Sequence, residues 1–190
     1  MAEIERWSPF RAWLYSLFNR NPKSNRAVVE LIGLTRDDRF LDIGCGPGAA
    51  LTEASNAGAD VAGVDPSPSM VERAQARVPA ADVKVGWAEE LPFPDDRFTV
   101  VINISSFHHW ADGEAGLMEA LRVLAPGGKL HVVEAKLGDG SDGHGLSPQE
   151  AESLAAKLLE LGFAESNVDQ MKPGWRNMYF VVTGKAPADE

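Results

Sequence analysis

Three glycines and two aspartates are the residues of this chain best suited to hold a nucleoside-bearing ligand. The apolar run 41–43 ends in a loop with Gly44, Gly46 and Gly48, and an alanine-rich helix is expected from Ala49. Glycine there permits a tight turn and a ligand lying close against the backbone. A second apolar run, 61–64, ends in Asp65, whose carboxylate can accept both hydroxyls of a ribose. The two strand ends therefore predict one nucleoside site.

The spacing of the glycines separates two classes of cofactor. Loops that bind dinucleotides run G-x-G-x-x-G, whereas this loop runs Gly44-x-Gly46-x-Gly48 behind Asp42. A carboxylate at Asp42 suits a cationic amino group rather than a pyrophosphate. A nicotinamide-dependent oxidoreductase is therefore an alternative that would need a different loop.

Four segments in order along the chain resemble the motifs of the class I S-adenosylmethionine-dependent methyltransferases, in particular the small-molecule enzymes of the type 11 group. They are residues 42–48 (DIGCGPG), 63–70 (GVDPSPSM), 89–98 (EELPFPDDRF) and 122–130 (RVLAPGGKL). The resemblance covers residues 39–134 almost continuously. It implies an enzyme that transfers a methyl group from S-adenosylmethionine to a small-molecule acceptor. We expect a monomer or a homodimer.

The resemblance further implies which residues bind the cofactor. Asp42 and the glycine loop would lie near its methionyl end, Asp65 at the ribose, and three further residues around the adenine. The expected cofactor set is Asp42, Gly44, Cys45, Gly46, Gly48, Asp65, Pro66, Met70, Trp87, Ala88, Glu89 and Asn103.

Two positions depart from the family pattern. Trp87 stands where relatives commonly have an aspartate that binds the adenine amino group. It is expected either to stack on the ligand or to fill the core, while the polar contact falls to Glu89, to backbone at Ala88 or to water. Thr99 replaces another common aspartate, far from the expected cofactor end, and is interpreted as structural.

Candidate catalytic residues follow the fourth expected strand, at the sheet edge where such folds bind ligands. The sulfonium is already an activated methyl donor, so alignment of the acceptor supplies most of the rate, and a base helps when the acceptor is a hydroxyl. His108 or His109 could take that proton, although the pair could equally pack and cap a helix. Ser105 and Asn103 are candidate contacts to acceptor or cofactor. Oxygen, nitrogen and carbon nucleophiles all remain possible as the methyl acceptor.

The sequence argues against two classes of acceptor and leaves one non-catalytic function as an alternative. A soft arsenic substrate needs several thiolates, and the chain has one cysteine. Methylation of an exocyclic base nitrogen typically uses an Asn or Asp followed by two prolines and an aromatic, which residues 103–106 (NISS) lack. A non-catalytic protein that binds the cofactor, or only a partner protein, remains the alternative from another functional class.

Composition limits the partners, the metal sites and the cellular location that this chain is expected to have. The formal net charge of −10 and the lack of a Lys/Arg cluster argue against nucleic acid as a partner. Cys45 is the only cysteine, so neither an intramolecular disulfide nor a cysteine-rich metal site is possible, and no metal is expected. No signal peptide and no apolar run approaching about 20 residues is found, which predicts a cytoplasmic protein without membrane contact.

The elements that must position these residues alternate between helix and strand, which predicts an α/β fold with a parallel sheet covered on both faces. Strands are expected at 39–43, 60–64, 83–87, 99–104, 129–134, 163–170 and 179–183, and helices at 23–32, 49–56, 68–77, 113–124 and from Ser147 to before Gly162. The resemblance implies a Rossmann-like three-layer sandwich with strand order 3-2-1-4-5-7-6 and an antiparallel seventh strand.

A single domain is expected from the 190 residues, with a helical segment at 1–35 packed on a core at 36–185. The amphipathic helix from Ser8 to Asn19 carries Trp13 and Phe18, which would either pack on the core or form a lid over the acceptor. The glycine-rich stretch 137–146 is interpreted as a linker, too short for the capping insertion that many relatives carry there.

Overall fold

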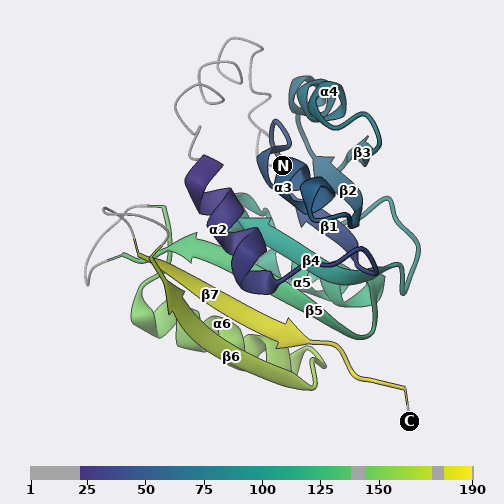
Figure 1. The fold of residues 1–190 in the computed structure, drawn as a ribbon. Coiled ribbons are helices and arrows are strands. Elements are labelled where there is room, and N and C mark those ends of the chain that lie inside the picture. Colours follow the sequence, from purple (N-terminus) through teal and green to yellow (C-terminus); the bar gives the residue numbers. More distant parts are fainter. Residues whose placement is uncertain (1–21, 138–143, 173–177, 190) are drawn as a thin grey trace.

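The computed structural model describes residues 22–137, 144–172 and 178–189, with side chains from residue 25 onward. Its elements alternate along the chain, as Figure 1 shows. They are α2 (Pro22–Ile32), β1 (Arg39–Ile43), α3 (Ala49–Asn56), β2 (Asp60–Asp65), α4 (Pro68–Arg77), β3 (Asp82–Val85), β4 (Phe98–Ile104), the 3₁₀ turn η1 (Phe107–His109), α5 (Gly113–Val123), β5 (Leu124–Ala135), α6 (Pro148–Glu160), β6 (Glu165–Met171) and β7 (Tyr179–Lys185).

The seven strands form one sheet in the order β3-β2-β1-β4-β5-β7-β6. Neighbouring strands from β3 to β5 are parallel, and β7 is antiparallel to both β5 and β6. The expected order and the antiparallel last strand are confirmed. After β1 the chain builds β2 and β3 on one side, and it then returns to place β4 on the other. The reversal makes the carboxyl ends of β1 and β4 the switch point where ligands bind in open α/β sheets.

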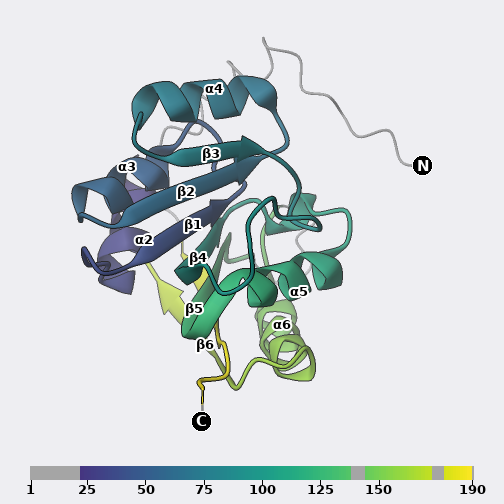
Figure 2. The ribbon, with the colours of Figure 1, turned by 90° about the vertical axis from the view of Figure 1, so that its right-hand side faces the viewer.

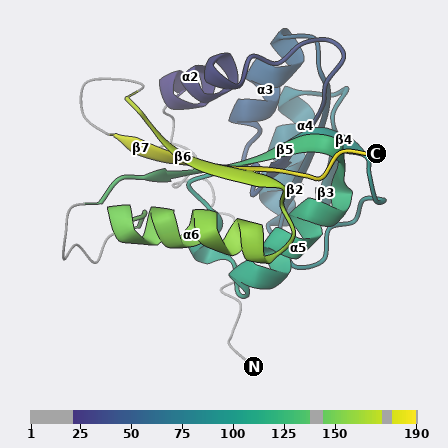
Figure 3. The same ribbon diagram turned by 90° about the horizontal axis from the view of Figure 1, so that it is seen from below.

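Helices cover both faces of this sheet. In Figures 2 and 3, α2, α3 and α4 lie on one side and α5 and α6 on the other. The central strands are buried on both faces, so they read as continuous apolar runs. In β1, for example, Phe40 packs with the α3 and α4 side, whereas Leu41 packs with the α5 and α6 side. The residues that follow these strands are therefore held by a rigid, two-sided core.

Most boundaries agree with expectation within two residues, and two strands differ for visible reasons. The third strand ends at Val85 because Trp87 leaves it to form an isolated bridge with Glu90. The fifth strand begins at Leu124 rather than at Lys129, since Phe98 already pairs with Leu124 and the register shifts before Val100 pairs with Lys129. Thr99 is structural, as expected, because its hydroxyl lies 2.9 Å from an Asp38 carboxylate oxygen.

The helix and lid expected around Trp13 and Phe18, and most of the 137–146 stretch, lie outside the described residues. Within 22–137, 144–172 and 178–189, no helix is long and apolar enough to cross a membrane.

Local side chains fix the start of α6, which follows β5 in the chain. Ser147 accepts a hydrogen bond from the Glu150 backbone N–H, and the Glu150 carboxylate accepts one from the Ser147 N–H at 2.8 Å. Pro148 occupies the first helical position, where its missing N–H leaves no helical bond unmade. This capping box satisfies two orphan donors of the helix.

Removal of this cap should destabilise the fold. We expect Ser147→Ala to lower the free energy of unfolding by about 1 kcal/mol, because the Glu150 N–H loses its acceptor. Urea denaturation followed by circular dichroism measures the change. Glu152→Ala, at an exposed position of the same helix, is the control and should shift stability by less than about 0.5 kcal/mol. Equal effects of the two substitutions would contradict the assignment.

Candidate functional site

The loop after β1 turns sharply between the ends of two neighbouring strands. Gly44 and the next residue both donate backbone hydrogen bonds to the Val64 carbonyl of β2, at 2.8 and 3.0 Å. Gly44 has φ of 78°, and a Cβ there would lie 2.8 Å from the Cβ of Ser106 and closer still to its hydroxyl. Glycine is therefore required at this position for both its backbone angle and its lack of a side chain.

The other two glycines of the loop have different roles. Gly48, at φ 79°, precedes α3, and a Cβ there would lie 3.0 Å from the Ala74 Cα of α4. Gly46 also has positive φ, but no described atom lies within 4 Å of a Cβ placed there. Of the three glycines, Gly46 is thus the one whose free side faces open space. That makes it the point at which a ligand can lie against the loop backbone.

Asp65 ties this loop to the end of β2. Its Oδ2 accepts the Gly46 N–H and its Oδ1 accepts the Ser67 N–H, both at 2.9 Å. The side chain is buried, and burial raises its pKa despite the two hydrogen bonds that lower it. Each oxygen keeps acceptor capacity beyond these bonds, since a carboxylate oxygen can accept more than one hydrogen bond.

Asp42 is a buried acid without a donor. It is 3% exposed on β1, and no residue of the described chain donates a hydrogen bond to its carboxylate. Burial, and then the nearby charge of Asp65, raise its pKa to about 8. A buried carboxyl group normally has partners, so this one favours a cationic ligand that would restore its charge.

The end of β4 brings a second unsatisfied group to the same place. The Asn103 amide nitrogen donates to the Ile43 carbonyl at 2.9 Å and lies 2.5 Å from the Ser106 hydroxyl. Its carbonyl oxygen Oδ1 is completely buried and has no hydrogen-bond partner among the described residues. An acceptor of this kind is free to bind a donor of a ligand.

The remaining predicted cofactor residues lie on the β2–α4 turn, in the first turn of α4 and after β3. Met70 and Ala88 are buried, Pro66 is exposed, and Glu89 accepts the Asp112 N–H at 3.1 Å. Trp87 is 46% exposed, so the alternative in which it fills the core is wrong. It is exposed because it bridges back to Glu90 instead of continuing β3.

Cys45 has a structural environment. A Cβ placed on Gly63 would lie 3.0 Å from the Cys45 Sγ, so the thiol packs closely over β2. Burial raises the pKa of the thiol, which keeps it protonated and unreactive. Any contact of Cys45 with a ligand would therefore come from its backbone.

Ser105 marks a strained turn after β4. Its φ is 53°, which is uncommon for a residue with a side chain, and its N–H donates to the Val133 carbonyl at 2.8 Å. Strain of this kind persists where the surrounding structure enforces it, as it often does at functional sites. Ser105 and Ser106 connect β4 with η1, and Ser106 packs against the glycine loop at Gly44.

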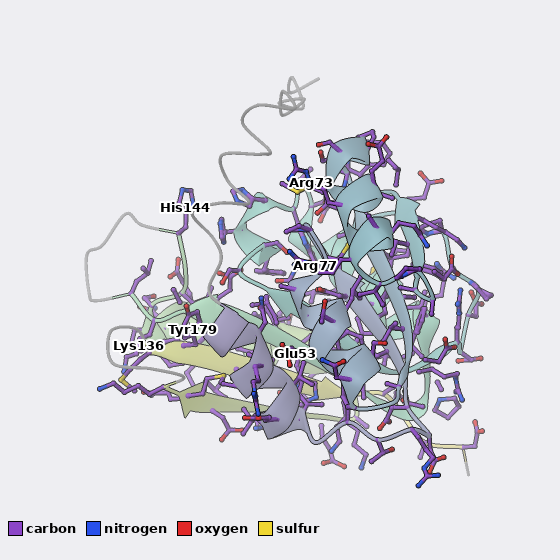
Figure 4. All side chains as sticks on the ribbon, turned by 45° about the horizontal axis from the view of Figure 1, so that its top comes forward. Glu53, Arg73, Arg77, Lys136, His144 and Tyr179 are labelled. Carbon is purple, nitrogen blue, oxygen red and sulfur yellow. The ribbon has the colours of Figure 1, made fainter. Side chains whose placement is uncertain are left out.

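The histidines of η1 meet two groups that sequence reasoning missed. His108 Nδ1 lies 3.1 and 3.2 Å from the two carboxylate oxygens of Glu134, at the end of β5. The His144 ring lies 4.7 Å from the His108 ring and 5.6 Å from the His109 ring, between centroids. Figure 4 shows His144 on the segment that follows β5, well apart from Lys136. The sequence did contain a signal for Glu134, because this carboxylate directly follows the mostly apolar run 130–133 (LHVV). It contained no signal that would place His144 near the histidine pair.

Solvent exclusion and the neighbouring imidazoles lower the pKa of His109, with Glu134 opposing them. His109 is therefore mostly neutral near pH 7. Among the described residues, no group of three or more His, Cys, Asp or Glu side chains is placed to hold a metal ion. The acids and the glycine loop at the ends of β1 and β2 can bind a cationic, hydroxyl-bearing ligand, and the histidines of η1 can exchange a proton.

Comparisons with known proteins agree with this geometry. The family described as methyltransferase domain matches residues 41–132. An uncharacterized methyltransferase of Synechocystis is 32% identical over 145 residues, which are 70% of this chain and 68% of that relative. A 27-O-demethylrifamycin SV methyltransferase of Amycolatopsis mediterranei is 37% identical over 71% of this chain and 50% of its own length. The chain spans 39% to 50% of the length of several curated relatives.

Solved structures share the fold. A phosphoethanolamine N-methyltransferase 2 of Haemonchus contortus, in complex with phosphomonomethylethanolamine and S-adenosylhomocysteine, superposes with a TM-score of 0.79. The alignment covers 97% of this chain and 58% of that chain, at 19% identity. At this identity the likeness concerns the fold alone.

The buried Asp42 should make stability depend on pH. Between its ordinary pKa of 3.8 and about 8, Asp42 is protonated in the folded chain and ionised in the unfolded chain. The folded state then binds more protons, so the free energy of unfolding falls as pH rises, by up to about 1.4 kcal/mol per unit. We expect Asp42→Asn, which cannot ionise, to lose less stability than wild type between about pH 5 and about pH 7.5. Denaturant titrations at the two pH values measure this, and parallel losses would contradict it.

Proposed function

Because this chain belongs to the class I S-adenosylmethionine-dependent methyltransferases, we propose that it transfers the methyl group of S-adenosylmethionine to a small-molecule acceptor. The observation that carries the proposal is the buried Asp42 carboxylate, which lacks a donor and lies on the strand that leads into the Gly46 loop. S-adenosylmethionine is the cofactor of this family. Its amino group could supply the donors that the Asp42 carboxylate lacks among the described residues, and its ribose hydroxyls could use the acceptor capacity that Asp65 keeps beyond its two backbone hydrogen bonds.

We assign the methionyl end of the cofactor to Asp42, Asn103 and the backbone at Gly46. Asp42 offers a carboxylate and Asn103 a free Oδ1, both acceptors for an ammonium group. Gly46 is the loop position that is open on its free side. Since Asp42 is protonated near neutral pH before binding, an ammonium placed beside it would favour release of that proton.

We assign the ribose to Asp65 and the adenine to the neighbourhood of Met70, Ala88 and Glu89. The exposed Trp87 ring offers an aromatic face beside the adenine position, which fits the stacking alternative. Glu89 keeps acceptor capacity beyond its bond to the Asp112 N–H and can serve the adenine amino group.

The acceptor side is assigned to Ser105, His108 and His109, which follow β4 at the same sheet edge. When bound, S-adenosylmethionine supplies a methyl group already activated by its sulfonium, so the protein mainly aligns the acceptor and receives a proton. The relative from Amycolatopsis is named for a small-molecule substrate, which supports the same acceptor class here.

Calorimetric titration tests the cofactor assignment. We expect micromolar binding of S-adenosylmethionine and S-adenosylhomocysteine and none of NADH. Repeating the titration in two buffers with different ionisation enthalpies should show net proton release near pH 7, because Asp42 ionises on binding. Binding of NADH in preference to the sulfur ligands would contradict the proposal. Binding without transfer to any acceptor would favour the non-catalytic alternative.

Substitution of Asp65 tests the ribose contact. We expect Asp65→Asn to weaken S-adenosylhomocysteine binding by about 10- to 100-fold, because charge-assisted hydrogen bonds to the ribose are lost. Asp60→Asn, at the exposed opposite end of the same strand, is the matched control and should bind as wild type does. Thermal unfolding of both variants checks that the fold is intact. Unchanged affinity in a folded Asp65→Asn variant would contradict the assignment of the ribose to Asp65.

A further inference from the structure

Glu134 is buried at the end of a central strand, and its carboxylate is fully engaged by η1. It is 1% exposed, Oε1 accepts the Phe107 N–H at 2.8 Å, and both oxygens lie within 3.2 Å of the His108 Nδ1. Among the described residues, no Lys or Arg pairs with Glu134. The acid therefore acts on His108 and on the backbone of its turn.

This geometry determines where the imidazole carries its proton. A carboxylate only accepts hydrogen bonds when ionised, so Nδ1 of His108 must be the donor. In the neutral ring Nε2 is then the acceptor, the reverse of the form that free imidazole side chains favour in water. The hydrogen bond of one ring nitrogen thus sets the role of the other.

The dyad lies beside the proposed cofactor site. Ser106, two residues before His108, packs over Gly44 and contacts the Asn103 amide. β4 and β5 are parallel neighbours, so Asn103 and Glu134 reach the same edge of the sheet. His108 is 19% exposed, which leaves its ring partly open to a ligand.

We propose that Glu134 is a positioning residue that holds His108 with Nε2 free as a general base, and that the acceptor of this enzyme is consequently a hydroxyl oxygen. The inference rests on the proposed function and extends it to the acceptor class. In the transfer, the acceptor oxygen bonds to the methyl carbon as the carbon–sulfur bond breaks and its electron pair stays on sulfur. The hydroxyl proton passes to Nε2 of His108, and the resulting imidazolium is paired with Glu134. A neutral amine has a lone pair for attack without prior loss of a proton, so it needs no such base.

The histidine neighbours fit this role. The His109 ring lies 4.1 Å from the His108 ring, between centroids, and the His144 ring lies 4.7 Å away. Among the described residues, His108 is the one of the three rings with a carboxylate oxygen within 4 Å. His108 therefore differs from the other two in having a fixed donor side, with Glu134 as the partner of its Nδ1.

The tautomer of His108 can be measured without any acceptor or cofactor. Long-range ¹H–¹⁵N spectra of the labelled protein report which ring nitrogen is protonated, and a His108→Gln variant assigns the signals. We expect the Nδ1–H form for His108. His109 is the internal control, and we expect the Nε2–H form for it. A predominant Nε2–H form at His108 in the folded wild-type protein would overturn the proposal.

Kinetics distinguish positioning from a purely structural role. With a hydroxyl acceptor, we expect Glu134→Gln to lower kcat by about 10- to 100-fold and to leave KM and S-adenosylhomocysteine affinity within about twofold. The matched control is Glu152→Gln, an exposed acid on α6, which should keep wild-type kcat. An unchanged kcat in Glu134→Gln, with the fold intact, would refute the positioning role.

The acceptor class is tested with matched pairs, such as phenol and aniline or benzyl alcohol and benzylamine, using radiolabelled S-adenosylmethionine. Transfer to the hydroxyl members supports the proposal. Transfer confined to amines, or no transfer to any hydroxyl member by a protein that binds S-adenosylhomocysteine, overturns it. Loss of S-adenosylhomocysteine binding itself would instead contradict the proposed function, so the two failures are distinguishable.

Discussion

The candidate site depends on one steric constraint, the close approach of Ser106 to the backbone at Gly44. No side chain fits between them, so the turn after β1 and the turn after β4 can lie against each other only with glycine at that position. The contact is reinforced by hydrogen bonds from Asn103 and Ser106 to the Ile43 carbonyl. Because β1 and β4 are neighbours at the switch point of the sheet, this contact brings the proposed cofactor loop and the histidine turn to one edge.

A second theme is the concentration of buried acids at that edge. Asp42, Asp65 and Glu134 are each less than one-tenth exposed, yet within the described part of the chain only Asp65 and Glu134 receive hydrogen bonds. Burial of an acid without a donor is unfavourable for folding, and a rigid two-sided core is what allows the chain to hold Asp42 there. On the assignment proposed above, a cationic ligand would relieve this penalty and so link stability and recognition at a single residue. The two histidines of η1 also differ, since of these two rings only His108 has a carboxylate partner among the residues that the structure describes.

Sequence reasoning was accurate where local patterns decide the structure. The helices Ala49–Asn56 and Pro68–Arg77 and the strand Arg39–Ile43 have the expected bounds, because apolar periodicity, a proline at the first helical turn and glycines mark them. It was wrong about the end of the third strand, and of its two alternatives for Trp87 the one that placed the ring in the core is excluded, because a bridge to Glu90 turns the chain away. It also missed Glu134 and His144, whose importance lies in contacts across 26 and 36 residues of chain from His108.

The sequence by itself determined the alternation of elements, the glycine loop, the acid at the end of each of two strands and, through its motifs, the family. These follow from short-range spacing, in which each residue's role is set by its neighbours in the chain. Only the tertiary structure decided which glycine is open to a ligand, which acid lacks a partner, and which histidine has its proton fixed. Those properties depend on atoms brought together by the crossing of the chain from β3 to β4 and on the exclusion of water from the sheet edge, and neither is encoded in local pattern.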